Sequence, residues 1–308
     1  MDCSLTRREM LRGLSGCLVA GLLSSAAPST APPNIRWAQG YLLWRNFKGR
    51  TLTLKDALAD LKAVGADGIE FSPQASELEQ QGLTPDALKT LLKQAGLSVS
   101  GNYFSAPFYD PSRKEEILRE AASRFALLRE FGAKNLIIGP PGGKETDSGR
   151  AQLIRQAAAV LNELGRRAVD QGLQIGLHPH LNTLIETPAE IDLAMEATDP
   201  RYVGLAADTG HIYLAGGDLL AVLGKYQSRL NYFHFKDGVR PFARPDFKPN
   251  LRELGKGEVD FPAVMRLLKK MRYRGWINIE QDATRLTPQE SATISMAYVT
   301  QTLKPIYA

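Results

Sequence analysis

The four histidines of the chain all lie in its second half, and each stands within a few residues of the end of a short apolar segment. Carboxylates and a lysine accompany them. The clusters read His178-Pro-His180, Asp208-Thr-Gly-His211, His234-Phe-Lys236-Asp237 and Glu280-Gln-Asp282. Imidazole nitrogens and carboxylate oxygens bind divalent metal ions, and both groups exchange protons in enzymes. The clusters therefore indicate a metal site with acid and base groups beside it.

The residues of these clusters divide into those that would bind the ion and those that would act on the substrate beside it. Asp208, His234 and Glu280 offer two carboxylates and an imidazole, a set suited to one Mn²⁺, Mg²⁺, Co²⁺ or Zn²⁺ ion. His178 and His180 are two apart, so on a strand both would point to the same side. We assign His178 to the metal and His180 to the catalytic base, although either histidine could be the ligand. A lone histidine is usually structural, but four convergent clusters favour a metal site.

The elements that position these clusters follow one repeated pattern, in which an amphipathic segment, a glycine turn and a short apolar run succeed one another. The expected helices after the first are Pro85–Gln94, Lys114–Phe131, Gln152–Gln171, Pro188–Ala197, Leu219–Tyr226, Phe261–Met271 and Pro288–Leu303. With a first strand near Ala38–Leu43, the pattern gives about eight strands and eight helices over roughly 270 residues. This count predicts an α/β fold, a single (β/α)₈ TIM barrel. No glycine-rich phosphate fingerprint supports an open dinucleotide-binding sheet.

A barrel of this type builds its active site at the carboxyl ends of the strands. The polar clusters stand at those ends, as do Trp44, Arg45 and Glu70, which we assign to substrate binding. Lys236 is a second catalytic candidate: it either stabilises developing negative charge or simply pairs with Asp237. The loop from residue 238 to 260, rich in arginine, proline and phenylalanine, leaves the same face and is expected to form a lid or wall rather than a neutral insertion.

Composition excludes several other classes of protein. The 308 residues are 44% hydrophobic and 23% charged, as in a soluble globular chain. The net charge of +5 is spread among acidic residues, so a nucleic-acid face is not expected. No stretch reaches the roughly 18 apolar residues of a membrane span.

The amino terminus differs in kind from the rest. Arg7 and Arg8 precede an apolar run from residue 13 to 23 and a zone of small residues, which is typical of a twin-arginine export signal over residues 1–31. Cys3 and Cys17, the two cysteines, would be removed with it, leaving a periplasmic barrel of residues 35–308 without thiols or membrane contact. Leu14-Ser-Gly-Cys17 also resembles a lipid-attachment box, which makes a lipid-anchored form the minor alternative.

The same motifs resemble those of the xylose isomerase-like barrel superfamily of sugar isomerases, epimerases and dehydratases, and most of all the inosose dehydratases. The matching segments are Trp44-Arg45-Asn46, His178-Pro-His180 with Thr183 and Thr187, Asp208-Thr-Gly-His211 with Gly216-Gly-Asp218, His234-Phe-Lys236-Asp237, Gly255-Lys-Gly257 with Asp260-Phe261, and Gly275-Trp-Ile-Asn-Ile-Glu280-Gln-Asp282. The resemblance implies that Asp208, His234, Glu280 and a histidine of the 178–180 pair bind metal. It also implies that His211 and Arg240 contact substrate hydroxyls.

The resemblance further implies a reaction. We expect a divalent-metal-dependent isomerase or epimerase that removes a proton next to the carbonyl of a keto-sugar or cyclitol. Members of the superfamily usually carry a glutamate on strand five, where this chain has histidine, which puts a two-carboxylate epimerase mechanism in doubt. A dehydratase or lyase that eliminates a β-substituent and a non-catalytic sugar-binding barrel are the alternatives. A small molecule is the expected partner, nucleic acid is not, and homo-oligomer formation stays open.

Overall fold

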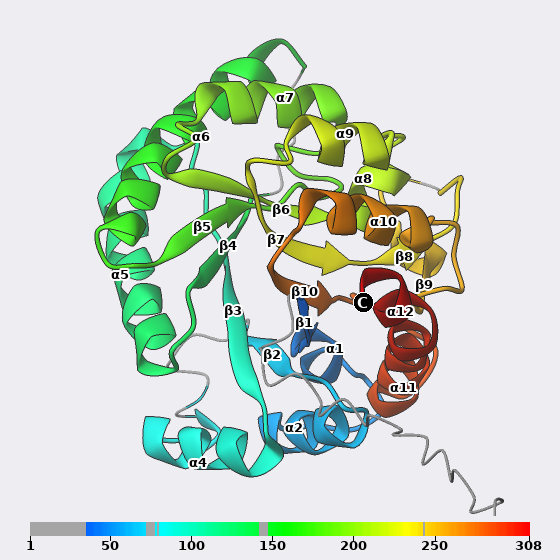
Figure 1. The fold of residues 1–308 in the computed structure, drawn as a ribbon. Helices are drawn as coiled ribbons and strands as arrows, with labels where there is room; N and C mark the ends of the chain where they lie inside the picture. Colours follow the sequence, from blue (N-terminus) through cyan, green and yellow to red (C-terminus); the bar gives the residue numbers. More distant parts are fainter. Residues whose placement is uncertain (1–34, 72–77, 79, 142–146, 243) are drawn as a thin grey trace, which may run out of the picture. The chain divides into compact units, whose positions relative to one another are not determined.

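Eight parallel strands close into a barrel in a computed structural model that describes residues 35–71, 78, 80–141, 147–242 and 244–308 (Figure 1). The strands pair in the order β1, β10, β7, β6, β5, β4, β3, β2, and β2 pairs back with β1. Their bounds are β1 Ile35–Gly40, β2 Gly68–Phe71, β3 Ser98–Ser105, β4 Asn135–Gly139, β5 Gln174–Leu177, β6 Val203–Asp208, β7 Leu230–Phe235 and β10 Gly275–Ile279. The predicted TIM barrel is confirmed. The export signal predicted for residues 1–31 lies outside the described residues and stays a prediction.

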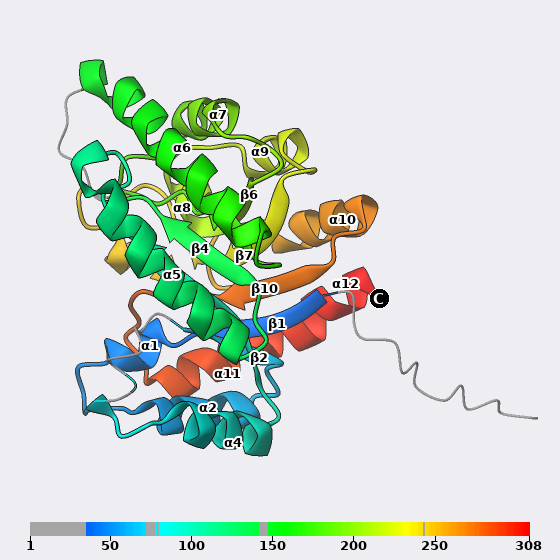
Figure 2. The same ribbon diagram turned by 90° about the vertical axis from the view of Figure 1, so that its left-hand side faces the viewer.

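Helices follow the strands in alternation and surround the barrel (Figures 1 and 2). The longer ones are α2 Leu54–Ala63, α4 Pro85–Ala95, α5 Lys114–Glu130, α6 Asp147–Val169, α7 Pro188–Ala197, α9 Leu219–Lys225, α10 Phe261–Met271 and α11 Pro288–Tyr298. The described residues also form the short helices α1 Leu42–Arg45, α8 Thr209–Leu214 and α12 Lys304–Tyr307, 3₁₀ turns at Pro111–Arg113 and Lys248–Asn250, and a π-helical stretch at Val299–Leu303. No helix within the described residues is long and apolar enough to cross a bilayer.

Local sequence explains where these helices begin and end. Thr187 and Thr287 each precede a proline, and each threonine hydroxyl accepts the backbone N–H three residues on while a glutamate there reciprocates, a capping box. Gly96 follows α4 with φ 72°, a left-handed conformation that glycine adopts without strain. Helix starts and stops were therefore predictable to within a few residues.

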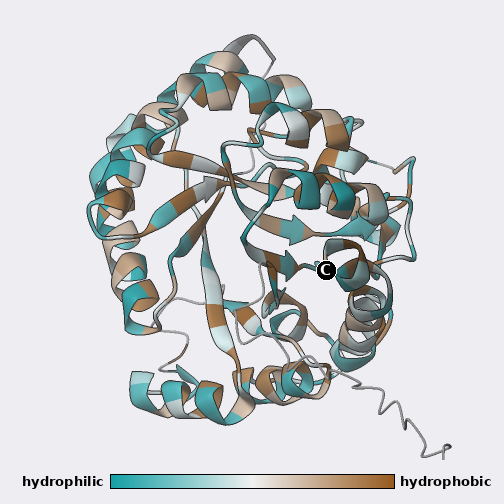
Figure 3. Ribbon diagram, viewed as in Figure 1, coloured by the Kyte–Doolittle hydropathy of each residue, from teal (hydrophilic) through white to brown (hydrophobic). Residues whose placement is uncertain are grey.

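The helices pack through one apolar face. In α10 the buried residues Phe261, Val264, Met265 and Leu268 recur every three or four positions, which turns one side of the helix to the barrel. Figure 3 shows the same alternation of hydrophobic and hydrophilic patches along the helices. The predicted bounds of α10 are confirmed.

The first strand was predicted too far along the chain. It spans Ile35–Gly40, and the apolar run after it forms the helical turn α1 instead of a strand. Trp44 is fully buried there, and its indole N–H donates to Asp60 Oδ2 at 2.8 Å. Arg45, beside it, is exposed. These contacts make Trp44 a core residue, and its predicted role at the substrate stays a prediction.

The loop after β7 is organised by one buried carboxylate. Asp237 begins a short hairpin of β8 Asp237–Gly238 and β9 Leu251–Arg252, and it is fully buried. Its Oδ1 accepts the backbone N–H groups of Gly238 and Val259, and its Oδ2 accepts those of Gly255 and Gly257, at 2.8–3.2 Å. A single side chain thus joins both ends of the loop.

Replacing Asp237 by Ala is expected to lower the free energy of unfolding by about 3 kcal/mol or more, because four backbone donors lose a charged acceptor. Asp246→Ala, in the exposed part of the loop, should change it by less than about 0.5 kcal/mol. Urea unfolding followed by circular dichroism measures both. Equal stability of the two variants would contradict this role for Asp237.

Candidate metal centre

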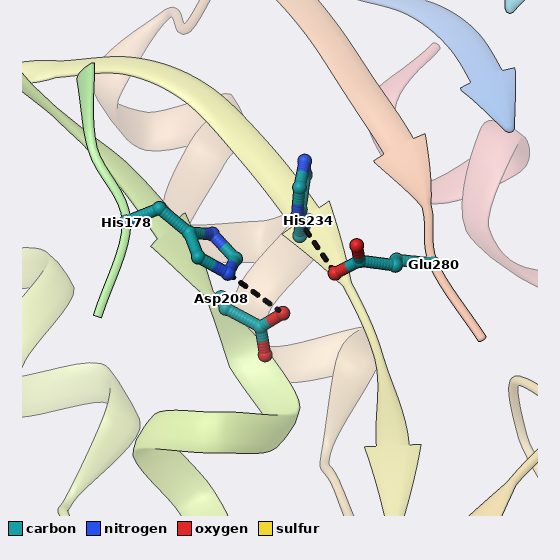
Figure 4. Close-up of side chains that lie close together, drawn as sticks. All are labelled: His178, Asp208, His234 and Glu280. Atoms are coloured by element: carbon teal, nitrogen blue, oxygen red, sulfur yellow. Dashed lines mark hydrogen bonds and ion pairs between the residues drawn. The ribbon is translucent and has the colours of Figure 1, made fainter. Parts of the chain in front are cut away.

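His178, Asp208, His234 and Glu280 converge in the mouth of the barrel (Figure 4). They come from the carboxyl ends of β5, β6, β7 and β10, and one ligand atom from each lies within 4.8 Å of the others. All four are buried. The predicted grouping of these strand ends is therefore found, and of the two candidate histidines it is His178 that joins this group. Two imidazoles and two carboxylates at this spacing suggest a divalent metal site.

Several polar atoms in this group lack a partner. No described residue hydrogen-bonds to either ring nitrogen of His178 or to Oδ2 of Asp208, and the atoms His178 Nε2 and Asp208 Oδ2 are 4.0 Å apart. Asp208 Oδ1, in contrast, accepts the backbone N–H of His211 at 2.7 Å and so caps helix α8. Buried polar atoms are nearly always paired. Buried lone pairs that face one another without a hydrogen bond, with Lys236 Nζ at 3.4 Å from Asp208 Oδ2, are an arrangement that a divalent cation would satisfy.

His234 lies between two carboxylates. Its Nδ1 is 2.8 Å from Glu280 Oε2, and its Nε2 is 2.8 Å from Glu70 Oε2. Metal-ligating histidines commonly use one nitrogen for the metal and donate from the other to a carboxylate. Glu70, which is 2% exposed, therefore contacts a candidate ligand and orients its ring. Its predicted role in binding substrate finds no support in this contact.

Glu70→Gln is expected to weaken binding of a divalent ion by about 10- to 100-fold, since the ring of His234 loses its anionic partner. Titration with Zn²⁺ against a competing chelator measures the change. Glu258→Gln, an exposed substitution, is the control and should bind as the unaltered protein does. Unchanged affinity in Glu70→Gln would show that Glu70 does not support the ligand.

Burial and charge set the protonation of the group. Burial, assisted by the charge of His234, lowers the pKa of His178 well below its usual value, so this ring is neutral and its lone pair is available. Burial raises the pKa of Asp208 to about 7, against the opposing charge of Lys236. Burial alone would lower the pKa of His234, but Glu280 and Glu70 raise it well above its usual value. Binding of a cation would therefore displace protons.

A second group adjoins the first. His180, His211 and Asp282 bring ligand atoms within 4.8 Å of one another, and the fully buried Lys236 lies among them. Lys236 Nζ is 2.7 Å from His211 Nε2 and 2.9 Å from Asp282 Oδ2. The alternative prediction that Lys236 pairs with its neighbour Asp237 is wrong, because adjacent residues of an extended chain point to opposite sides.

His180 has the features of a base. Its Nδ1 donates to the carbonyl oxygen of Leu181 at 2.7 Å, which leaves the lone pair on Nε2. Burial lowers the pKa of His180, so the ring is neutral near pH 7. Its centroid is 3.7 Å from that of His211, whose pKa burial also lowers well below its usual value. Two neutral imidazoles thus stand side by side next to the metal-ligand group.

The loop from residue 238 to 260 covers this second group. Phe247 packs edge-on against His180 and His211, with ring centroids 5.7 and 5.2 Å apart. Asn182 Nδ2 donates to the carbonyl of Pro245 at 2.7 Å, and Arg244 forms an ion pair with Glu186. The loop therefore makes a wall beside the imidazoles, which agrees with the predicted wall.

Arg240, which was predicted to contact substrate, lies at the surface, and two residues beside the site were not assigned from the sequence. Arg240 is exposed, stacks on Tyr213 and donates to the carbonyls of Tyr213 and Gly217, so it braces the end of α8. Asp282 was not assigned to the site from the sequence, although its position two residues after Glu280 places it in the same polar cluster. Tyr103, at the end of β3, packs on His178 and His234 with ring centroids 5.5 and 6.4 Å away. The signal for Tyr103 in the sequence was its position among polar residues at the end of a predicted strand.

Comparison with known proteins identifies relatives that share the barrel. Residues 58–301 match the model of the family described as xylose isomerase-like TIM barrel. The inosose dehydratase of Bacillus velezensis is 30% identical over 301 residues, which cover 86% of this chain and 96% of the relative.

Solved structures share the fold at low identity. A structure of IOLI protein with a binding zinc atom aligns with a TM-score of 0.75 at 16% identity, covering 89% of this chain and 99% of the other. The probable 3-DHS dehydratase AsbF of Bacillus anthracis aligns with a TM-score of 0.72 at 14% identity, covering 87% and 99%. The match over most of the barrel, together with the convergent strand ends, leads to one conclusion: the chain belongs to the xylose isomerase-like TIM barrel family.

Proposed function

We propose that the protein is a divalent-metal-dependent dehydratase, which removes a proton next to the carbonyl of a keto-cyclitol or keto-sugar and then expels a β-hydroxyl as water. The observation that carries the proposal is the buried four-residue group with unpaired lone pairs on His178 and Asp208. The name of the Bacillus velezensis relative, inosose dehydratase, supports elimination over isomerisation.

The residues present fit a metal ion. His178, Asp208, His234 and Glu280 would hold it, with Glu70 behind His234. A divalent ion bound there would act as a Lewis acid on a substrate oxygen and raise the acidity of the neighbouring carbon. The zinc atom of the IOLI structure makes Zn²⁺ a first choice, beside Mn²⁺, Mg²⁺ and Co²⁺.

The chain's own residues would move the proton. His180 Nε2 takes it from the carbon next to the carbonyl, and the C–H pair moves into the new double bond as the C–O bond to the β-hydroxyl breaks. The same imidazole then hands the proton to the leaving hydroxyl, which departs as water. His211 is held by Lys236 at Nε2, which leaves its Nδ1, buried and without a hydrogen-bond partner among the described residues, as the donor to a substrate hydroxyl. The fixed charge of Lys236 stabilises the negative charge that develops.

The arrangement of acid and base groups favours elimination from one face of the ring. A two-base epimerase needs a free carboxylate on each face of the substrate. Here strand five supplies His178 instead, and Glu280 is bonded to both His234 and Lys236. His180 and His211 lie together beside the candidate metal-ligand group, so a single base on that side would serve a syn elimination.

Incubation with inososes, ketoses and 3-keto-glycosides in D₂O tests the proposal. The metal-loaded protein is expected to form an unsaturated product with loss of water, and a chelator should stop the reaction until the ion is restored. Deuterium exchange without loss of water would indicate an isomerase or epimerase. Binding of a sugar without either change would identify a sugar-binding barrel and contradict the proposal.

We also propose that the protein acts in the periplasm, on the basis of Arg7-Arg8 and the apolar run that follows. Cell fractionation with and without a working twin-arginine pathway tests this. Replacement of both arginines by lysine should retain the protein in the cytoplasm, and export that is unaffected would contradict it.

A further inference from the structure

The ammonium group of Lys236 is surrounded by acceptors of the protein itself. Its ammonium group contacts His211 Nε2 at 2.7 Å, Asp282 Oδ2 at 2.9 Å and Glu280 Oε2 at 2.9 Å, with Asp208 Oδ2 at 3.4 Å. An ammonium group has three N–H donors. All three have a protein acceptor, so none is left for a substrate, and the side chain acts as a fixed charge.

The groups around this charge are those of a metal site. His180, His211 and Asp282 offer two imidazoles and a carboxylate within 4.8 Å of one another, next to the first group of four ligands. The rings of His180 and His211 lie side by side, and His211 Nδ1 is buried without a hydrogen-bond partner. A nitrogen-rich set of this kind suits Zn²⁺, Co²⁺ or Mn²⁺. The ammonium of Lys236 lies among these atoms.

Charge explains why a cation is needed there. Four carboxylates lie close together with little exposure, namely Glu70, Asp208, Glu280 and Asp282. One divalent ion supplies two positive charges, and buried anions left without a partner are costly. His234 lies between Glu70 and Glu280, and Lys236 is the cation that lies against Glu280 and Asp282.

We propose that Lys236 takes the place of a second metal ion. The side chain fills the adjoining ligand set, so the protein binds one divalent ion per chain, and removal of the side chain opens a second site made of His211, Asp282 and His180. The inference rests on the metal centre of the proposed function, which supplies the first ion.

Metal stoichiometry tests the inference directly. The unaltered full chain, saturated with Mn²⁺ and passed through a desalting column, is expected to retain one ion by elemental analysis. Lys236→Ala should retain two, and electron paramagnetic resonance should show a spin-coupled Mn²⁺ pair. Lys236→Ala combined with Asp282→Asn should return to one. Lys248→Ala, an exposed lysine of the neighbouring loop, is the matched control and should retain one.

The outcomes separate this inference from the proposed function. No ion in the unaltered protein would contradict the metal centre itself. One ion in a folded Lys236→Ala variant, with no coupled pair, would overturn the inference alone. Should Lys236→Ala fail to fold, the unaltered protein still decides: retention of a second Mn²⁺ ion with Lys236 in place overturns the inference, and saturation at one ion up to millimolar Mn²⁺ supports it.

Discussion

Asp208→Asn is expected to lower kcat/KM by about 10³-fold or more while the barrel stays folded, because loss of this charge from the candidate metal site would remove several kcal/mol of transition-state stabilisation. The substitution separates the two oxygens of the side chain. Oδ1 caps α8 by accepting the N–H of His211, and asparagine caps a helix about as well as aspartate does. Oδ2, which faces His178, becomes an uncharged amide that cannot serve as an anionic ligand.

Measurement of activity, metal content and thermal unfolding tests this expectation. Asp218→Ala is the control, because Asp218 caps the exposed start of α9 in the same manner and lies outside both ligand groups. Loss of that cap costs about 1 kcal/mol of stability and should leave turnover unchanged. Activity close to normal in Asp208→Asn, or a metal content that does not fall, would remove Asp208 from the metal site.

His180→Gln is expected to lower kcat by about 10²- to 10⁴-fold, the usual contribution of a general base, with little change in metal content. Glutamine is polar and of similar length but cannot take up a proton. The measurement is the rate of deuterium exchange at the α-carbon, which should fall together with the rate of elimination.

The same experiment decides between the two histidines that follow β5. His178→Gln should lose the ion, whereas His180→Gln should retain it and lose the proton transfer. The reverse result would make His180 the ligand and His178 the base. A KM that rises in His180→Gln while kcat is kept would instead indicate a residue that only binds substrate.

The sequence predicted the barrel well because its local signals agree with the fold. Proline after threonine starts the helices at residues 188 and 288, and glycine ends the helix before residue 96. The first strand was displaced because Leu42-Leu43-Trp44 is a short apolar run, and periodicity cannot tell such a run from a buried helical turn. The same displacement placed Trp44 and Arg45 at the end of a strand, whereas they lie in the helical turn α1.

The candidate site was predictable in its members but not in its pairings. The clusters around Asp208, His234 and Glu280 follow apolar strands, and a parallel barrel brings such ends together. The contact of His234 with Glu70 joins residues 164 positions apart and depends on the side-chain rotamer. Lys236 and Asp237 point to opposite sides of the chain. Predicting which of them faces the histidines would have required the strand register, because a shift of one residue exchanges the two environments.

The two oxygens of Asp208 bear on how His211 is positioned relative to the candidate ion. One oxygen holds the first turn of α8, which carries His211, and the other faces the candidate ion. A carboxylate is planar and rigid, so one functional group links the backbone at His211 to the candidate ion, and Lys236 and Phe247 hold the His211 ring in addition. Because Phe247 packs on His180 and His211 and Arg240 donates to the end of α8, the alignment of these imidazoles also depends on the loop that carries Phe247 and Arg240.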